Sequence, residues 1–196
     1  MKVIILEGGK SEIDRIQFDI RLSIDSIFRH IPKEDILGLD HVLVTGLPLK
    51  KNGHNHNALG AYFKRQGNRQ AHIELYVKNL FGHIESAESL RQMLPIQEFG
   101  LAQTIYHEVG HHVRDIRTHG LKKNKSEYFA KSYTQNILNR YVLDNAKSVN
   151  DCFEFLKSVA RDRGLSLDVI RHMECGWELS YKKALKSTET EALKKK

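Results

Sequence analysis

Hydrophobic residues recur at the spacing of an α-helix through most of the second half of this 196-residue chain. The pattern predicts five helices, over residues 86–94, 96–117, 126–143, 150–163 and 166–186. Pro95 is expected to end the first of these helices, and Gly164 to separate the last two. Because these helices follow a first half that contains the predicted strands, the order of elements indicates an α+β fold.

The first half of the chain combines one predicted helix with short predicted strands. The helix begins at Ser11, with Asp14 in a capping-box position, and ends at Pro32. Strands are expected over residues 3–6, 40–45, 59–65 and 71–79, and the turn 66–68 joins the last two as a hairpin. In the last strand polar and apolar residues alternate, which is typical of a strand with one buried face. We therefore expect a small, mostly antiparallel sheet.

The composition is typical of a globular protein, with 40% hydrophobic and 28% charged residues. No stretch approaches the roughly 20 apolar residues that span a bilayer, and the apolar run at the N-terminus is shorter than a signal-peptide core of about 7–15 residues. We therefore expect a cytoplasmic protein without a membrane partner. Much of the net charge of +7 comes from lysines in one loop and at the C-terminus. Since no nucleic-acid-binding module accompanies them, we expect no nucleic-acid partner.

The predicted elements divide the chain into three parts. Residues 1–145 are expected to form one domain, and residues 146–187 a helical C-terminal extension that packs on it. The lysine-rich segment 188–196 is expected to be a disordered tail. The sequence gives no indication of the oligomeric state.

The helix predicted over residues 96–117 contains the run His-Glu-Val-Gly-His, from His107 to His111. Residues four apart lie on one face of a helix, so the two imidazoles can bind a single metal ion. Glu108 is rotated from His107 by about 100°, which lets its carboxylate reach a metal-bound water. Two ligands and one general base are the roles in the H-E-x-x-H motif. Gly110, between the histidines, is explained by a close neighbour, and His112 points away from the ion.

A catalytic zinc ion normally takes a third protein ligand and leaves one position for water. Glu127 is one candidate, because its carboxylate lies on an otherwise largely apolar face of the helix predicted over residues 126–143. His119, in the loop between the two helices, is the main alternative. Asp115 lies one turn beyond His111 and is expected to orient a ligand histidine rather than to bind the metal itself.

The sequence resembles the gluzincin metallopeptidases, in particular the compact single-domain proteins called minigluzincins. The resemblance rests on the run from His107 to His112, on Glu127-Tyr-Phe-Ala130 in the next helix, and on the strand pair that precedes them. It covers roughly residues 40–140. It implies a zincin-like fold with the active-site helix packed beneath a small sheet, and an edge strand over residues 71–79 along which an extended peptide binds.

The resemblance also implies the roles of individual residues. Zinc would be held by His107, His111 and Glu127, and Glu108 would activate a water molecule. A further group often stabilises the oxyanion, and Tyr133 and His119 are candidates for it. The resemblance does not extend beyond about residue 145.

Taken together, the motif and the resemblance predict a metallopeptidase with Zn2+ as its cofactor and a peptide or protein as its substrate. One alternative is a regulatory or binding protein with the same fold, in which the zinc site is dormant or structural. Glu108 favours catalysis, because a structural site has no use for a base beside its ligands. In a further alternative, the helices after residue 145 bind a partner that the metal domain cleaves.

Overall fold

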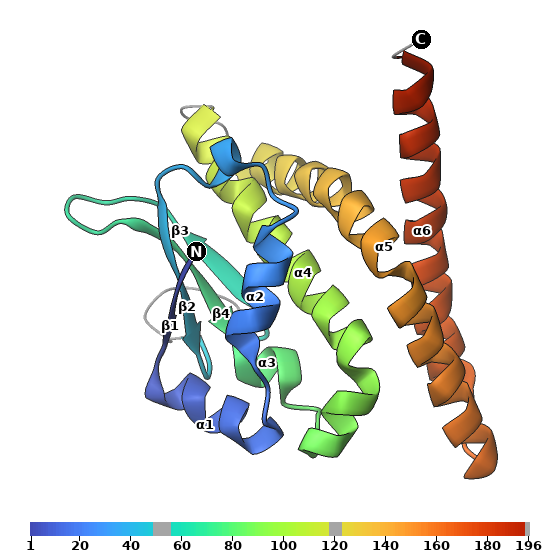
Figure 1. Ribbon diagram of the computed structural model, residues 1–196. Helices are drawn as coiled ribbons and strands as arrows, with labels where there is room; N and C mark the ends of the chain where they lie inside the picture. The colour runs from blue at the N-terminus through green and yellow to red at the C-terminus, as the bar shows by residue number, and fades with distance from the viewer. Residues whose placement is uncertain (49–55, 118–122, 195–196) are drawn as a thin grey trace.

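The computed structural model describes residues 1–48, 56–117 and 123–194, and these residues form an α+β fold. The helices are α1 (Glu7–Ile16), α2 (Ile20–Phe28), α3 (Val77–Phe81), α4 (Ala87–Arg117), α5 (Lys123–Asp162) and α6 (Asp168–Lys194), with a short 3-10 helix at Lys33–Ile36. The strands are β1 (Lys2–Ile5), β2 (Leu39–Thr45), β3 (Gly60–Phe63) and β4 (Ala71–Tyr76). The sheet lies on one side of the molecule, α4 lies between the sheet and α5, and α6 is outermost (Figure 1).

The sheet is mixed, with the strand order β1-β2-β4-β3. β1 and β4 both pair with β2 in parallel, and only the hairpin of β3 and β4 is antiparallel. The expectation of a mostly antiparallel sheet is therefore wrong. The reason is that α1 and α2 carry the chain back between β1 and β2, and a crossover of this kind produces parallel strands. As a second correction, β4 is an inner strand, and the edge of the sheet beside it is β3.

The alternating residues of β4 are buried on both faces of the sheet, which differs from the expected single buried face. His72, Glu74 and Tyr76 are 3%, 4% and 0% exposed. The Tyr76 hydroxyl donates a hydrogen bond to the Glu74 carboxylate at 2.9 Å. Although burial by itself raises the pKa of Glu74, contacts with His72 and Tyr76 outweigh it and lower that pKa. His72 in turn contacts Arg69 and the backbone oxygen of Gln70, so each polar side chain of β4 has a partner, which allows it to be buried.

The helix expected from Ser11 to Pro32 is divided into α1 and α2. Gln17 ends α1 in a left-handed conformation with φ of 52°. Asp19 then caps α2, since its carboxylate accepts a hydrogen bond from the backbone N–H of Leu22 at 3.1 Å. The buried isoleucines continue at helical spacing across this break, so hydrophobic periodicity alone does not reveal it.

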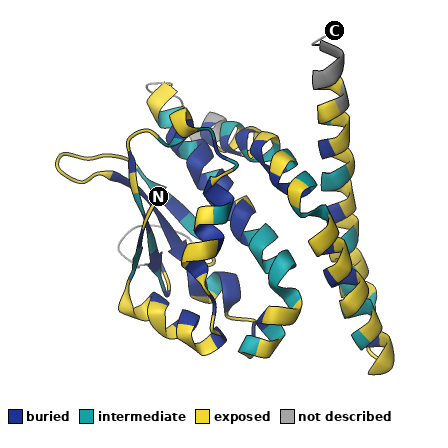
Figure 2. Cartoon of the chain, viewed as in Figure 1, coloured by how far each residue is buried: buried dark blue, intermediate teal, exposed yellow. Residues whose placement is uncertain are grey.

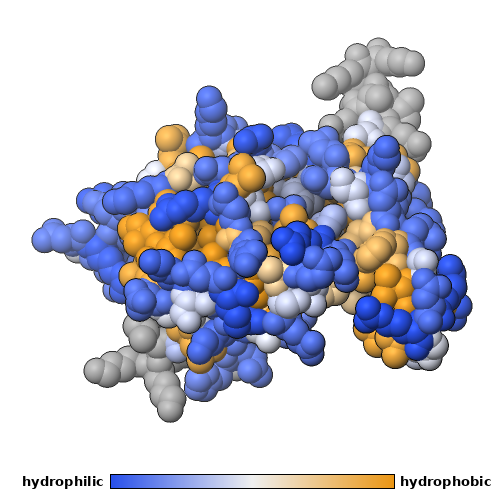
Figure 3. Space-filling view, turned by 60° about the horizontal axis from the view of Figure 1, so that its bottom comes forward, coloured by the Kyte–Doolittle hydropathy of each residue, from blue (hydrophilic) through white to orange (hydrophobic). Residues whose placement is uncertain are grey.

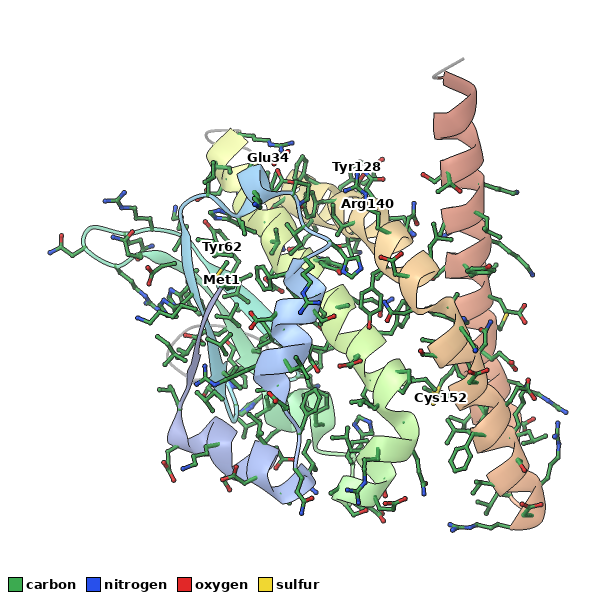
Figure 4. All side chains as sticks on the ribbon, viewed as in Figure 1. Met1, Glu34, Tyr62, Tyr128, Arg140 and Cys152 are labelled. Carbon is green, nitrogen blue, oxygen red and sulfur yellow. The ribbon has the colours of Figure 1, made fainter. Side chains whose placement is uncertain are left out.

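The helix α4 is continuous through Pro95, where the sequence predicts a boundary. A proline lacks the backbone N–H and therefore removes one helical hydrogen bond. In the structure Pro95 faces α5, where it lines a small cavity together with Ser148 and Cys152. Next to it, the buried thiol of Cys152 on α5 donates to the backbone oxygen of Gln92 at 3.2 Å. Cys152 lies between α5 and the first turns of α4 (Figure 4).

The chain ends in two long helices. α5 runs without interruption from Lys123 to Asp162, so the domain boundary expected after residue 145 lies inside a helix. Gly164, with φ of 64°, lies between α5 and α6 as predicted. α6 is helical as far as Lys194 and includes most of the segment that we expected to be disordered.

Burial is unevenly distributed between the sheet region and this pair of helices. Buried residues concentrate in the sheet and in α4, whereas much of α6 is exposed (Figure 2). Leu165 and Val169 are 59% and 71% exposed, and hydrophobic residues gather on the surface at this end of the α5–α6 pair (Figure 3).

The hydrophobic core lies where α2 and α4 pack against the sheet. Val44 of β2, Leu75 of β4, Ile24 of α2, and Leu101 and Ile105 of α4 are completely buried in one cluster. Each such side chain contributes about 1.5–3 kcal/mol through its burial. This core fixes α4 against the sheet, and α4 contains the candidate site. In the described part of the chain, none of the helices combines the length and hydrophobicity needed to cross a bilayer.

Candidate metal centre

Two helices bring three potential metal ligands together. His107 and His111 lie one turn apart on α4, and their Nε2 atoms are 3.2 Å apart. Glu127, at the start of α5, extends one carboxylate oxygen to 3.4 Å from His107 Nε2 and the other to 3.5 Å from His111 Nε2. Among the described residues, these three form a group whose donor atoms all lie within 4.8 Å of one another.

The spacing of these donor atoms fits a single tetrahedral ion. Ligand atoms bound to zinc at about 2.0–2.1 Å in a tetrahedron are about 3.3–3.4 Å apart from one another. The two Nε2 atoms are 3.2 Å apart, and they lie 3.4 and 3.5 Å from different oxygens of the Glu127 carboxylate, so the three side chains surround a space of about this size. Two imidazoles and one carboxylate are also a ligand set that zinc accepts in catalytic sites. The Glu127 side chain is 49% exposed, so the site is accessible from solvent.

A close contact between the two helices places Glu127 at the histidines. Gly110 lies between His107 and His111, and a Cβ atom added to it would be 2.8 Å from the Cα atom of Ala130. Any side chain at Gly110 would therefore push α5 away from α4. Ala130 is three residues beyond Glu127, so this contact controls how near the carboxylate lies. The close neighbour expected from the sequence is thus the backbone of α5.

The second nitrogen of His111 has a partner that the sequence did not suggest. His111 Nδ1 lies 2.9 Å from the Ser126 hydroxyl, a buried group next to Glu127. A hydrogen bond of this kind fixes the ring orientation of a metal-binding histidine. In the sequence, the only sign of this role for Ser126 is that it is adjacent to Glu127. Asp115, which we expected to orient a ligand, instead accepts a hydrogen bond from the Tyr62 hydroxyl at 3.2 Å.

His112 lies outside the group of three, as its position on the helix predicts. Its Nε2 atom lies 3.0 Å from the backbone oxygen of Leu37, and its Nδ1 atom 3.2 Å from the Tyr62 hydroxyl. Tyr62 on β3 therefore connects the edge strand to α4 beside the candidate site (Figure 4).

The two remaining predicted site residues are placed differently. Tyr133 donates its hydroxyl hydrogen to the buried carboxylate of Asp35 at 2.9 Å, and it does not line the cavity at the histidines. Arg117 also pairs with Asp35. His119 lies outside the described residues.

Glu108 is buried beside the ligands, with 7% of its surface exposed. Burial raises its pKa to about 7, the nearby charge of Glu127 adds to this shift, and a hydrogen bond with the backbone of Tyr62 opposes it. Burial also lowers the pKa of His107. Burial and the nearby charge of His107 lower the pKa of His111 to about 4. Both histidines are therefore neutral at pH 7, as a metal ligand must be.

A cavity of about 550 Å³ opens at His107 and Glu108, between α4, α5 and the beginning of β3. Gly60 brings the edge strand close to α4, because a Cβ atom added to it would be 3.0 Å from the Thr104 methyl group. Lys131 and Gln135 of α5 line the opposite side. The volume is within the range of about 300–1,000 Å³ typical of ligand-binding sites.

Comparisons with known proteins do not assign a family or a function to this site. No protein-family model matches the chain, and neither a curated protein nor a solved structure shows significant similarity to it.

Proposed function

We propose that this protein is a zinc-dependent metallopeptidase of the zincin type. The observation that carries the proposal is the convergence of His107, His111 and Glu127, whose imidazole nitrogens lie 3.2 Å apart and 3.4–3.5 Å from the two carboxylate oxygens, next to the buried carboxylate of Glu108. This convergence supports a zinc site with three protein ligands. The adjoining cavity supports access of a substrate to the fourth position.

When bound, zinc supplies Lewis acidity that lowers the pKa of water and polarises the scissile carbonyl group. Glu108 takes a proton from the attacking water as the oxygen bonds to the carbonyl carbon. The same carboxyl group then donates this proton to the amine nitrogen as the C–N bond breaks. The hydrogen bond with the Tyr62 backbone holds the Glu108 carboxylate in place during these transfers. Ser126 keeps the His111 ring oriented.

The edge strand β3 supports binding of an extended peptide. Among the described strands β3 pairs with β4 alone, so its other edge offers backbone groups to a further strand. Gly60, at the beginning of β3, lines the same cavity as His107 and Glu108. A peptide that adds to β3 by backbone hydrogen bonds is therefore brought to the metal centre.

Metal content and hydrolysis together test the proposal. We expect one zinc ion per chain in protein purified without chelators, and its loss in His107→Ala and His111→Ala. Glu127→Ala should bind zinc at least tenfold more weakly, whereas Tyr128→Ala serves as the control. Tyr128 is adjacent to Glu127 and 78% exposed, and it points outward from α5 (Figure 4). Wild-type protein without stoichiometric zinc would contradict the proposal.

Glu108→Gln separates a catalytic zinc site from a dormant or structural one. The substitution keeps the size of the side chain but removes the base, so we expect unchanged zinc content and peptide hydrolysis reduced by about 10²–10⁴-fold. If the zinc-loaded wild type cleaves no peptide of a diverse library, the protein is instead a binding or regulatory protein with a dormant site. If Glu108→Gln cleaves as fast as the wild type, Glu108 is not the base.

A further inference from the structure

A second cavity, of about 420 Å³, adjoins the one at the metal centre and lies between α4, α5 and α6. Apolar side chains form most of its wall: Ile96, Phe99, Val149, Phe153, Met173 and Trp177. Gly100 and Gln103 of α4 line this cavity and also the cavity at His107 and Glu108. The two cavities therefore adjoin each other along one side of α4.

The wall that α6 contributes is firmly held. Trp177 is 2% exposed and packs edge to face against Phe99, with ring centroids 5.0 Å apart. Its indole N–H donates a hydrogen bond to the side-chain oxygen of Asn150 at 2.8 Å. Because the Phe99 contact and the Asn150 hydrogen bond hold the Trp177 ring in one orientation, the ring provides a preformed apolar surface.

Two glycines keep the cavity open. A Cβ atom added to Gly100 or to Gly176 would meet no heavy atom within 4 Å. A glycine inside a helix costs about 1 kcal/mol relative to alanine, and no close contact requires it at either position. Both residues line the second cavity, so the missing side chains leave room for a group from another molecule.

We propose that this cavity binds a large apolar side chain of the peptide that is cleaved at the metal centre, which makes α6 a specificity element. This inference rests on the function proposed above. Gly100 precedes His107 by seven residues on α4, about 10 Å along the helix. An extended peptide advances about 3.3–3.6 Å per residue, so the bound side chain lies about three residues from the scissile bond. Gln103, exposed between the two cavities, offers its amide to the peptide backbone.

Fluorescence of Trp177 reports occupancy of the cavity directly, because it is the single tryptophan of the chain. Zinc-loaded Glu108→Gln protein is titrated with tryptophan-free peptides of alanine and serine that contain one leucine or phenylalanine. We expect a saturable change in fluorescence, and at least tenfold weaker binding when alanine replaces the large residue. Absence of any preference for the apolar residue would overturn the inference.

Filling the cavity provides a second test. Gly176→Leu on α6 and Gly100→Leu on α4, each in the same Glu108→Gln background, place a large side chain at positions that line the cavity. Both should abolish the preference for leucine over alanine while zinc content stays unchanged. Cys175→Leu is the matched control, because Cys175 is exposed, adjacent to Gly176 and absent from the cavity wall. Retention of the preference in both filled variants would contradict the proposal.

Cleavage by the wild type distinguishes this inference from the proposed function. We expect the scissile bond about three residues from the leucine or phenylalanine; cleavage at unrelated positions would rule out the subsite. If the zinc-loaded wild type binds the same peptides with the same preference but leaves them intact, the cavity is a peptide-binding site and the proposed peptidase activity is wrong.

Discussion

The two halves of α4 are packed in opposite ways, and its two inner glycines show the difference. At Gly110, in the C-terminal half, an added Cβ atom would be 2.8 Å from the backbone of Ala130. At Gly100, in the N-terminal half, it would meet no atom within 4 Å. The same residue type therefore brings α5 into contact at the metal centre and leaves space at the adjoining cavity.

This difference corresponds to two separate requirements. Metal ligands must be held within a few tenths of an ångström of their positions, since zinc–ligand distances vary little. Close packing of α4 on α5 meets this requirement at His107, His111 and Glu127. A side-chain subsite instead needs volume, because residues of different shape must enter it. The N-terminal half of α4 supplies that volume.

Gly110→Ala is expected to have the largest effect, because the new methyl group would contact the α5 backbone rather than a flexible side chain. We expect a loss of about 3 kcal/mol in the free energy of unfolding, at the upper end for overpacking. Displacement of α5 also moves Glu127, so zinc affinity should fall by at least tenfold. Urea denaturation and zinc titration measure the two effects.

The same substitution at Gly100 is the control for this experiment. If Gly110→Ala leaves both stability and zinc affinity at wild-type values, α4 and α5 are not in the close contact described, and the contrast between the two halves of α4 disappears.

Ser126→Ala is expected to have a smaller effect on the tightly packed half. It removes the hydrogen bond to His111 Nδ1 and leaves all three metal ligands in place. We expect about a tenfold loss of zinc affinity, the lower end of the range of about 10–100-fold for such partners. Competition with a chelator of known affinity measures it. An unchanged affinity would mean that the packing around Gly110 alone orients the His111 ring.

The residues at the candidate site were largely predictable from the sequence, because they depend on local helical geometry. Spacing along one helix placed His107 and His111 on the same side and Glu108 beside them. Glu127 was predicted from a carboxylate on an apolar stripe. Ser126 could not be predicted in the same way, because its role depends on how two helices cross, and a serine at the start of a helix has many ordinary explanations.

The arrangement of the strands was less predictable, because it depends on contacts between distant parts of the chain. The alternation in β4 is real, but His72, Glu74 and Tyr76 all have hydrogen-bond partners when buried, so polarity did not indicate solvent exposure. The parallel pairing of β2 with β4 depends on where the β3–β4 hairpin inserts. A local pattern contains no information on either point. The break at Gln17 likewise depends on one backbone conformation.

Gly100→Ala is expected to have the smallest effect, and its sign is opposite to that of Gly110→Ala. The methyl group enters open space, so only the change in helix propensity contributes, and the protein should become more stable by up to about 1 kcal/mol. Zinc affinity should not change, because α5 is not displaced. The comparison uses one chemical change at two positions of a single helix, so a general effect of alanine on α4 cannot produce opposite signs. Destabilisation at Gly100 similar to that at Gly110 would show that both halves of α4 are closely packed, and thermal unfolding of the two variants side by side measures this directly.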